Sequence, residues 1–264
     1  MLTSWTKLHY LIQSKRKSFP LEPGQFWSFY GGKVNLPLYY CRIQKITLTQ
    51  EFEQGAVVKL HVNKLKATPS PENVIQWADK NMPVGCGTFL VMGSFVLLTP
   101  DNVSHQIVPH TSTSGSEYTI LPKNGEVWAV YRSWTHRLNV FDLEMNHLDY
   151  DIVEVLDDAF DYKVLALEAV FIDSEDEEKK TVFRAAERRH PGCDDEDGSE
   201  VIFTIPKSKM LRFSHQIPAT RITKEIQGAL NEVFEVDRRA LPESLNVRPL
   251  SKGSKRRLGK DSFF

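Results

Sequence analysis

Gly24-Gln25-Phe26-Trp27-Ser28-Phe29-Tyr30 recurs in the second half of the chain as Gly125-Glu126-Val127-Trp128-Ala129-Val130-Tyr131. Each stretch opens with a glycine, continues with an amide or an acid, and then alternates bulky positions as far as a tyrosine. This alternation is typical of a half-buried β-strand that follows a turn. The sequence therefore predicts the first strand of a small β unit, and it predicts that unit twice.

Two further pairs of short segments follow in the same order. Gly85-Cys86 is repeated as Gly192-Cys193, and Ser104-His105-Gln106-Ile107 is repeated as Ser214-His215-Gln216-Ile217. Because three matches occur in one order, we interpret the chain as a tandem duplication. The repeated residues indicate a binding function rather than a catalytic one.

The two copies differ in the connection after their first strand. Ten positions separate Tyr30 from Tyr40, whereas nineteen separate Tyr131 from Tyr150, which indicates nine extra residues in the second copy. Surface loops tolerate insertions that paired strands do not. We therefore expect a long hairpin connection within Arg132–Asn146.

Composition places limits on the class of protein. The 264 residues are 41% hydrophobic and 25% charged, which suits a soluble protein of two domains. A net charge of −1 argues against binding nucleic acid through bulk electrostatics. The three cysteines form no Cys-x-x-Cys pair, so we expect a reducing compartment and no zinc site. No apolar run is long enough to span a membrane.

The chain divides into five expected parts. They are an N-terminal helix at 1–19, a first β unit at 20–110, a linker at 111–122, a second β unit at 123–242 and a disordered basic tail at 243–264. Short helices are also expected near 71–80 and 223–233, the latter from the helical spacing of Ile226, Leu230 and Val233. An alternative for the linker is that Tyr118–Leu121 forms a last strand.

Catalytic and metal-binding patterns fail on spacing. The segment from Cys193 to Thr204 has Asp195, Asp197 and Gly198 at calcium-loop positions, but it lacks the carboxylates that its two ends require. There is no Gly-x-Ser-x-Gly elbow. A Cys86–His105 nucleophile pair is a weaker alternative, because paired structural roles explain the repeat more simply. We expect no catalytic residue, no metal and no cofactor.

Three segments together resemble a known family. They are Leu36-Pro37-Leu38-Tyr39-Tyr40-Cys41-Arg42-Ile43, Leu211-Arg212-Phe213-Ser214-His215-Gln216-Ile217-Pro218, and 234–242. With the two Gly-x-x-Trp-x-x-Tyr strands, they resemble the plant-specific domain of unknown function that usually follows the J domain in plant DnaJ-like proteins. The resemblance covers about Pro20 to Pro242 and implies no settled activity. His190-Pro191 is not followed by Asp, so the chain is not expected to stimulate a chaperone ATPase by itself.

The first copy also resembles the opening of PWWP and Tudor-type barrels, chromatin modules in which aromatic side chains surround a methylated lysine. The resemblance places Tyr39 at one wall of that cage, while Leu36 and the segment 60–62 depart from the pattern. Quaternary ammonium groups are attracted to ring faces. The candidate ligand-binding residues are Tyr30, Tyr39, Tyr40, Tyr131, Trp27 and Trp128. A small barrel needs large core side chains, which favours the two tryptophans as core.

The sequence thus predicts a mainly β protein with two small SH3-like or Tudor-like barrels and short peripheral helices. We expect a non-catalytic interaction module that binds a peptide, such as a modified histone tail, in a chromatin or transcription setting. The alternative is a client-binding region of a DnaJ-like protein, with a J-domain protein or chaperone acting in trans and extended segments held by strand addition. The expected location is the nucleus, with the cytoplasm as the alternative; membrane and direct nucleic-acid binding are not expected.

Overall fold

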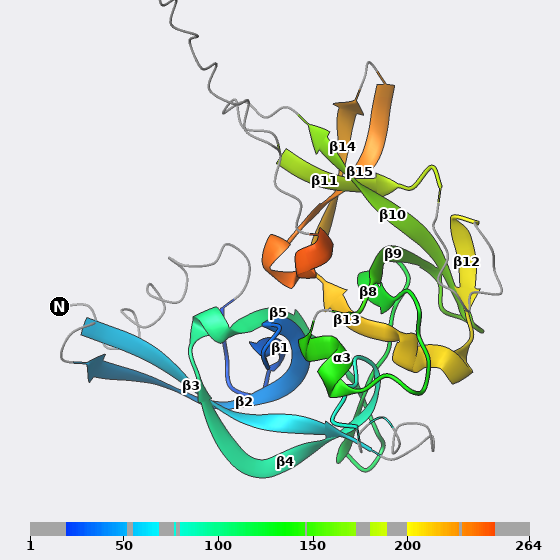
Figure 1. Ribbon diagram of the computed structural model, residues 1–264. Coiled ribbons are helices and arrows are strands. Elements are labelled where there is room, and N and C mark those ends of the chain that lie inside the picture. The colour runs from blue at the N-terminus through cyan, green and yellow to red at the C-terminus, as the bar shows by residue number, and fades with distance from the viewer. Residues whose placement is uncertain are drawn as a thin grey trace, which may run out of the picture.

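The computed structural model describes residues 20–51, 55–68, 77, 80–145, 147–172, 180–188, 200–226 and 229–245, and it is mainly β (Figure 1). The described strands form two antiparallel sheets. The first sheet has the order β5-β1-β2-β3-β4-β7-β6. Its strands are β1 (Phe26–Gly31), β2 (Leu36–Glu51), β3 (Gly55–Ala67), β4 (Gly87–Leu98), β5 (Val103–Ile107), β6 (His110–Thr111) and β7 (Glu117–Ile120).

The second sheet has the order β13-β8-β9-β10-β11-β15-β14, and β12 pairs with β10 beside this path. Its strands are β8 (Val127–Tyr131), β9 (Tyr150–Asp157), β10 (Tyr162–Ile172), β11 (Lys180–Ala185), β12 (Ile202–Ile205), β13 (Phe213–Ile217), β14 (Ala219–Ile226) and β15 (Ala229–Val236). The described helices are α3 (Val140–Glu144) and four 3₁₀ turns: η1 (Pro100–Asn102), η2 (Lys207–Arg212), η3 (Arg238–Ala240) and η4 (Glu243–Leu245).

The seven strands that follow one another across each sheet have the same topology in both sheets. Each begins with the strand that carries Ser-His-Gln-Ile, continues through the strand that carries the tryptophan, and ends on a hairpin. The strand register also agrees. Trp27 lies opposite Gln106, and Trp128 lies opposite Gln216, at matching positions of the repeated segments.

The turn before the first strand has the same hydrogen bonds in both halves. Trp27 Nε1 donates to Gln25 Oε1 over 2.9 Å, and Trp128 Nε1 donates to Glu126 Oε2 over 2.9 Å. The same oxygens accept the backbone N–H three residues earlier. Gly24 and Gly125 adopt positive φ angles of 92° and 83°, a conformation that glycine adopts at little cost. The repeated Gly-[Gln/Glu]-x-Trp pattern therefore forms a turn in which the glutamine or glutamate side chain holds the indole ring two residues later.

The expected closed barrels are not confirmed. The strand pairing leaves each sheet open, with β5 and β6 at the edges of the first and β13 and β14 at the edges of the second. Each sheet instead curls around its own apolar cluster. Trp27 and Phe29 belong to the cluster inside the first sheet, while Trp128 and Val130 belong to the one inside the second.

A third cluster is shared by both sheets. It contains Leu38 and Tyr40 of β2 together with Ala129 of β8 and Ile152 of β9. Because strand residues alternate between faces, one face of these strands lines the interior of its own sheet and the other packs against the opposite sheet. The two units are therefore joined through a common core.

The extra residues of the second copy lie where they were predicted, between β8 and β9. The length was underestimated, because the sequence comparison matched Tyr150 with Tyr40. In the register, Tyr40 lies opposite Ser28 and Ile152 lies opposite Ala129, so Ile152 corresponds to Tyr40 and the insertion is two residues longer. The connection contains α3, whose N-cap Asn139 accepts hydrogen bonds from the N–H groups of residues 141 and 142.

Two other expectations were wrong. The linker at 111–122 instead contributes to the first sheet, where β7 pairs with β4 and with β6; the alternative of a last strand near Tyr118 is confirmed. The helix expected at 223–233 is a hairpin of β14 and β15, with Ile222 opposite Val233. β-branched residues in 219–226 and Gly228 disfavour a helix, and Leu230 of the supposed apolar stripe is 79% exposed.

Several expectations fall outside the described residues. These are the N-terminal helix at 1–19, the tail from 246 onward and Cys193. The helix near 71–80 lies outside them too, except for Trp77 and Lys80. Within the described part of the chain, no helix is long and apolar enough to cross a membrane.

Candidate functional site

The six aromatic candidates do not gather around an open cavity. Tyr39 alone among them is half-buried; the other five lie in the core, with exposed fractions of 6% or less: Trp27, Tyr30, Tyr40, Trp128 and Tyr131. Burying a large side chain contributes roughly 1.5–3 kcal/mol to folding. In this arrangement the five buried rings serve as core rather than as walls of a ligand cage.

Tyr30 joins the two halves of the molecule, and Tyr40 makes a contact within the first half. Tyr30 Oη donates to Asp237 Oδ2 over 3.3 Å and lies 3.2 Å from Ser104 Oγ, and the Arg239 guanidinium lies 4.4 Å from the centre of its ring. Tyr40 Oη donates to the carbonyl of Gly85 over 2.5 Å. These contacts tie β1 to the segment after β15, and β2 to the segment before β4.

The repeated Ser-His segments meet between the sheets. His105 Nε2 donates to Gln216 Oε1 over 3.0 Å, so its Nδ1 accepts from Ser28 Oγ over 2.9 Å. In the second copy, His215 Nε2 donates to the Ala240 carbonyl over 2.8 Å and Nδ1 accepts from Ser214 Oγ over 3.0 Å. Burial lowers the pKa of both histidines to about 4, so both are neutral at neutral pH.

A Ser–His pair is also the start of a hydrolase site, but the surroundings do not suit catalysis. Ser214 is 1% exposed and His215 is fully buried, so a substrate cannot reach either in this arrangement. The two described cysteines, Cys41 and Cys86, are also buried. Cys86 Sγ donates to the Met210 carbonyl, and burial raises the pKa of Cys86 and raises that of Cys41 to about 12. Such thiols remain protonated and weakly nucleophilic.

The outer part of β4 has a free edge. β7 pairs with β4 only from Gly87 to Leu90, and within the described residues no strand covers the same edge from Val91 to Leu98. Three apolar side chains here are exposed: Phe95 is 67% exposed and Leu97 is 58% exposed, and Met92 is exposed as well. We call this region, 91–98, the β4 edge. In Figure 1, β4 forms the outer rim of the first sheet.

The strands behind the β4 edge are basic. Between 36 and 50 and between 55 and 67, the sequence has no carboxylate and has five cations, which are Arg42, Lys45, Lys59, Lys64 and Lys66. In the second sheet the strand that corresponds to β2 is β9, and it carries Asp151, Glu154 and Asp157. Charge is therefore divided between the sheets although the whole chain is nearly neutral.

A pocket lies at the connection between β8 and β9. A pocket of about 370 Å³ is lined by residues from this connection and from η2, which are Arg132, Trp134, Thr135, His136, Arg137, Lys209 and Arg212. We call it the arginine pocket. The sequence predicted the loop but not the site; the available signal was the cluster of cations in the inserted segment and in 207–212.

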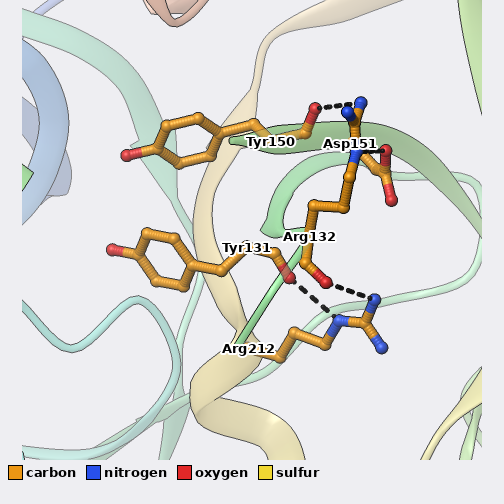
Figure 2. Close-up of polar contacts among 5 residues, drawn as sticks. All are labelled: Tyr131, Arg132, Tyr150, Asp151 and Arg212. Carbon is orange, nitrogen blue, oxygen red and sulfur yellow. Dashed lines mark hydrogen bonds and ion pairs between the residues drawn. The ribbon is translucent and has the colours of Figure 1, made fainter. Parts of the chain in front are cut away.

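Backbone and carboxylate oxygens fix two of its guanidinium groups (Figure 2). Arg132 Nε donates to Asp151 Oδ1 over 2.8 Å, and its Nη2 donates to the Tyr150 carbonyl over 3.2 Å. Arg212 is 5% exposed; its Nε donates to the Tyr131 carbonyl over 3.0 Å and its Nη2 to that of Arg132 over 3.4 Å. Both cations are thus held in place before any ligand arrives.

No group of three or more His, Cys, Asp or Glu residues in the described parts of the chain could hold a metal ion. The family model described as "Domain of unknown function (DUF3444)" matches residues 6–226. Comparison with the curated proteins and with the solved structures found no significant match.

Proposed function

The chain belongs to the family described as Domain of unknown function (DUF3444), and from that premise we propose a non-catalytic interaction module that binds an extended segment of a partner protein. The segment adds as a strand to the β4 edge. The free backbone groups and exposed side chains of 91–98 support this proposal. Such an edge offers main-chain hydrogen bonds for affinity and side-chain contacts for selectivity.

The surface around the β4 edge favours an acidic and apolar segment. Phe95 and Leu97 offer apolar contacts, while β2 and β3 supply five cations and no carboxylate between 36–50 and 55–67. Like charges repel, so a lysine-rich histone tail is less suited to this surface than an acidic segment. The buried positions of five of the six aromatic candidates likewise favour strand addition over recognition in an aromatic cage.

The matching topology supports a tandem duplication whose copies differ along the strand that follows β3 or β10. In the second sheet β11 and β12 both pair with β10 and together occupy the position of β4, and β15 pairs with β11 at Phe183 and Phe234. Because β14 and β15 are longer than β6 and β7, the two copies end differently. We place the proposed binding unit in the first copy, because Phe95 and Leu97 on the β4 edge are more exposed than Ile202 of β12, which is 40% exposed.

A client-binding role remains a second candidate, because exposed Met92, Phe95 and Leu97 also suit unfolded chains. The two roles differ in selectivity. A specific module selects one pattern of apolar and acidic residues, whereas a client holder binds many unfolded chains. A J-domain partner in trans and a nuclear location stay predictions.

The test begins with selection of peptides of about ten residues, the length of a long strand, from a random library. Selected peptides should alternate apolar and acidic residues. The double variant Phe95→Lys/Leu97→Lys should weaken their binding at least about tenfold, or about 1.4 kcal/mol. The matched control, Phe160→Lys/Leu230→Lys, makes the same change at sites that are 86% and 79% exposed and should bind normally.

Equal binding by both double variants would exclude the β4 edge as the site. An unfolded protein such as reduced, carboxymethylated lactalbumin serves as the comparison. If it competes fully with every selected peptide, the client-binding role is favoured over the specific module.

A further inference from the structure

The arginine pocket is lined almost entirely by hydrogen-bond donors. Its polar side chains come from three arginines, a lysine, a histidine, a tryptophan and a threonine, with no carboxylate among the lining residues. Trp134 Nε1 is buried and has no hydrogen-bond partner among the described residues. Arginine, lysine and tryptophan side chains donate and cannot accept. The matching ligand is consequently rich in acceptors and negatively charged.

We propose that the arginine pocket binds the phosphate monoester of a phosphorylated side chain on a partner protein. Arginine groups bind phosphate through paired N–H donors, with geometric selectivity as well as charge. The site is separate from the β4 edge, and the proposal does not depend on strand addition there.

The charge of the pocket favours a dianion over a carboxylate. Arg132, Arg137, Lys209 and Arg212 line it, and Asp151, which pairs with Arg132, offsets one of these four charges. Phosphate monoesters carry a charge of about −1.5 to −2 at neutral pH and have three acceptor oxygens. A single carboxylate would leave more of the positive charge without compensation.

The pocket is preorganised on one side and open on the other. Arg132 and Arg212 are fixed by the contacts described above, so little conformational entropy is lost when they meet an anion. Arg137 and Lys209 are exposed, and their side chains form no hydrogen bond or ion pair with the described residues. They are able to close over a phosphate that enters from solvent.

The surroundings favour a protein ligand over a nucleic acid. A nucleic acid needs a basic track that follows several phosphates. Here the basic cluster is local: the neighbouring strand β9 carries Asp151, Glu154 and Asp157, and the chain has a net charge of −1. The volume of about 370 Å³ exceeds that of one phosphate and leaves room for the side chain that carries it.

The test uses the full chain and a short phosphoserine peptide flanked by alanines, at constant ionic strength. The comparison ligands are the unphosphorylated peptide, inorganic phosphate and a single-stranded thymidine oligonucleotide. The readout is the indole N–H nuclear magnetic resonance signal of Trp134, which lines the pocket. We expect a saturable shift with the phosphopeptide alone, or with inorganic phosphate at lower affinity.

Two double variants locate the binding. Arg137→Ala/Lys209→Ala should reduce phosphopeptide affinity at least about tenfold, because it removes two of the four cations. Lys163→Ala/Lys224→Ala removes the same charge at exposed sites elsewhere and should bind normally. Urea unfolding of each variant checks that both remain folded.

Four outcomes would overturn the proposal. The first is the absence of a saturable shift at phosphopeptide concentrations up to about 10 mM, and the second is an equal loss of affinity in the two double variants. The third is inorganic phosphate that binds as tightly as the phosphopeptide, and the fourth is an oligonucleotide that binds more tightly than either. The last two would assign the site to free phosphate and to nucleic acid, respectively.

Discussion

Gly85 lies directly against the backbone of the second half of the chain. A Cβ atom at this position would lie 2.2 Å from the carbonyl oxygen of Ser214 and 2.3 Å from that of Phe213. Both oxygens belong to the backbone of β13, so they cannot move aside as a flexible side chain could. Only glycine fits between β13 and Tyr40, whose hydroxyl binds the Gly85 carbonyl.

We expect Gly85→Ala to lower the free energy of unfolding by about 3 kcal/mol, because the added methyl group forces β13 away from the segment before β4. Urea unfolding followed by tryptophan fluorescence measures the change. Gly93→Ala is the control, since a Cβ there would meet no atom within 4 Å. A loss of under 1 kcal/mol in Gly85→Ala would show that the two halves are not in tight contact here.

His105, which is partly buried, and His215, which is fully buried, make stability depend on pH. The pKa of His105 and of His215 is lowered to about 4 in the folded chain, against about 6.5 when unfolded. The unfolded state therefore binds more protons as the pH falls from about 6.5 towards 4, and stability decreases over that window. The loss between pH 7 and pH 5 should be about 2 kcal/mol per histidine.

Urea unfolding at pH 7 and pH 5 checks this prediction. Burial raises the pKa of Glu126 and of Glu154, which opposes part of the effect at the acidic end. A midpoint that is equal at the two pH values would contradict the neutral state of His105 and His215.

The sequence predicted the important residues correctly more often than it predicted their roles. The repeated tryptophans were favoured as core, and they are core. The tyrosines were candidate ligand-binding residues. In the folded chain the hydroxyls of Tyr30 and Tyr40 instead bind groups at distant positions, Asp237 and the Gly85 carbonyl. No local pattern contains that information.

At the scale of the element, the β4 edge is the feature with the clearest test of exposure. Phe95→Lys and Leu97→Lys should each change the free energy of unfolding by less than about 0.5 kcal/mol, since both side chains are largely exposed. Val62→Ala, in the paired strand but fully buried, should cost about 1–2 kcal/mol. Urea unfolding compares the three. A loss above 2 kcal/mol for either lysine variant would mean that another part of the chain covers the edge.

We expect the N-cap of α3 to stabilise the connection between β8 and β9. Asn139 caps α3, and Asn139→Ala should cost about 1 kcal/mol because two backbone N–H groups lose their acceptor. Thermal unfolding measures the loss, and Asn139→Asp, which retains an acceptor oxygen, should restore most of the stability. Equal losses in the two variants would show that the cap does not hold this loop.

Element type was predicted correctly for the two repeated tryptophan strands and for the Tyr118 strand, and wrongly for the segment 223–233. The hairpin of β14 and β15 was mistaken for a helix because three apolar residues matched a helical period by chance, although Leu230 is exposed. The choice between the two depends on pairing with β11, which is a tertiary contact.

At the scale of the whole molecule, the shared core makes one folding unit of two sheets. We expect a single unfolding transition in which tryptophan fluorescence and far-ultraviolet circular dichroism coincide. A fragment of residues 20–123 should not fold alone, because Leu38 and Tyr40 would lose the side chains of the second sheet that cover them. Two separated transitions, or a folded fragment, would contradict the shared core.

The sequence predicted the repetition but not this arrangement. The repeated segments identified corresponding strands, which the common strand order confirms. Closed barrels were expected because each unit was considered alone. In the folded chain each sheet buries one face against the other sheet, so neither sheet has to close into a barrel. The repeated segments alone do not distinguish these two arrangements.

A partner segment that adds as a strand to the β4 edge forms main-chain hydrogen bonds there. Hydrogen exchange with mass spectrometry, with and without a library-selected peptide, detects these bonds. We predict that bound peptide slows exchange in 91–98 and leaves β14 unchanged, because new main-chain hydrogen bonds form only along β4. Unchanged exchange in 91–98, with slower exchange elsewhere, would contradict strand addition at the β4 edge.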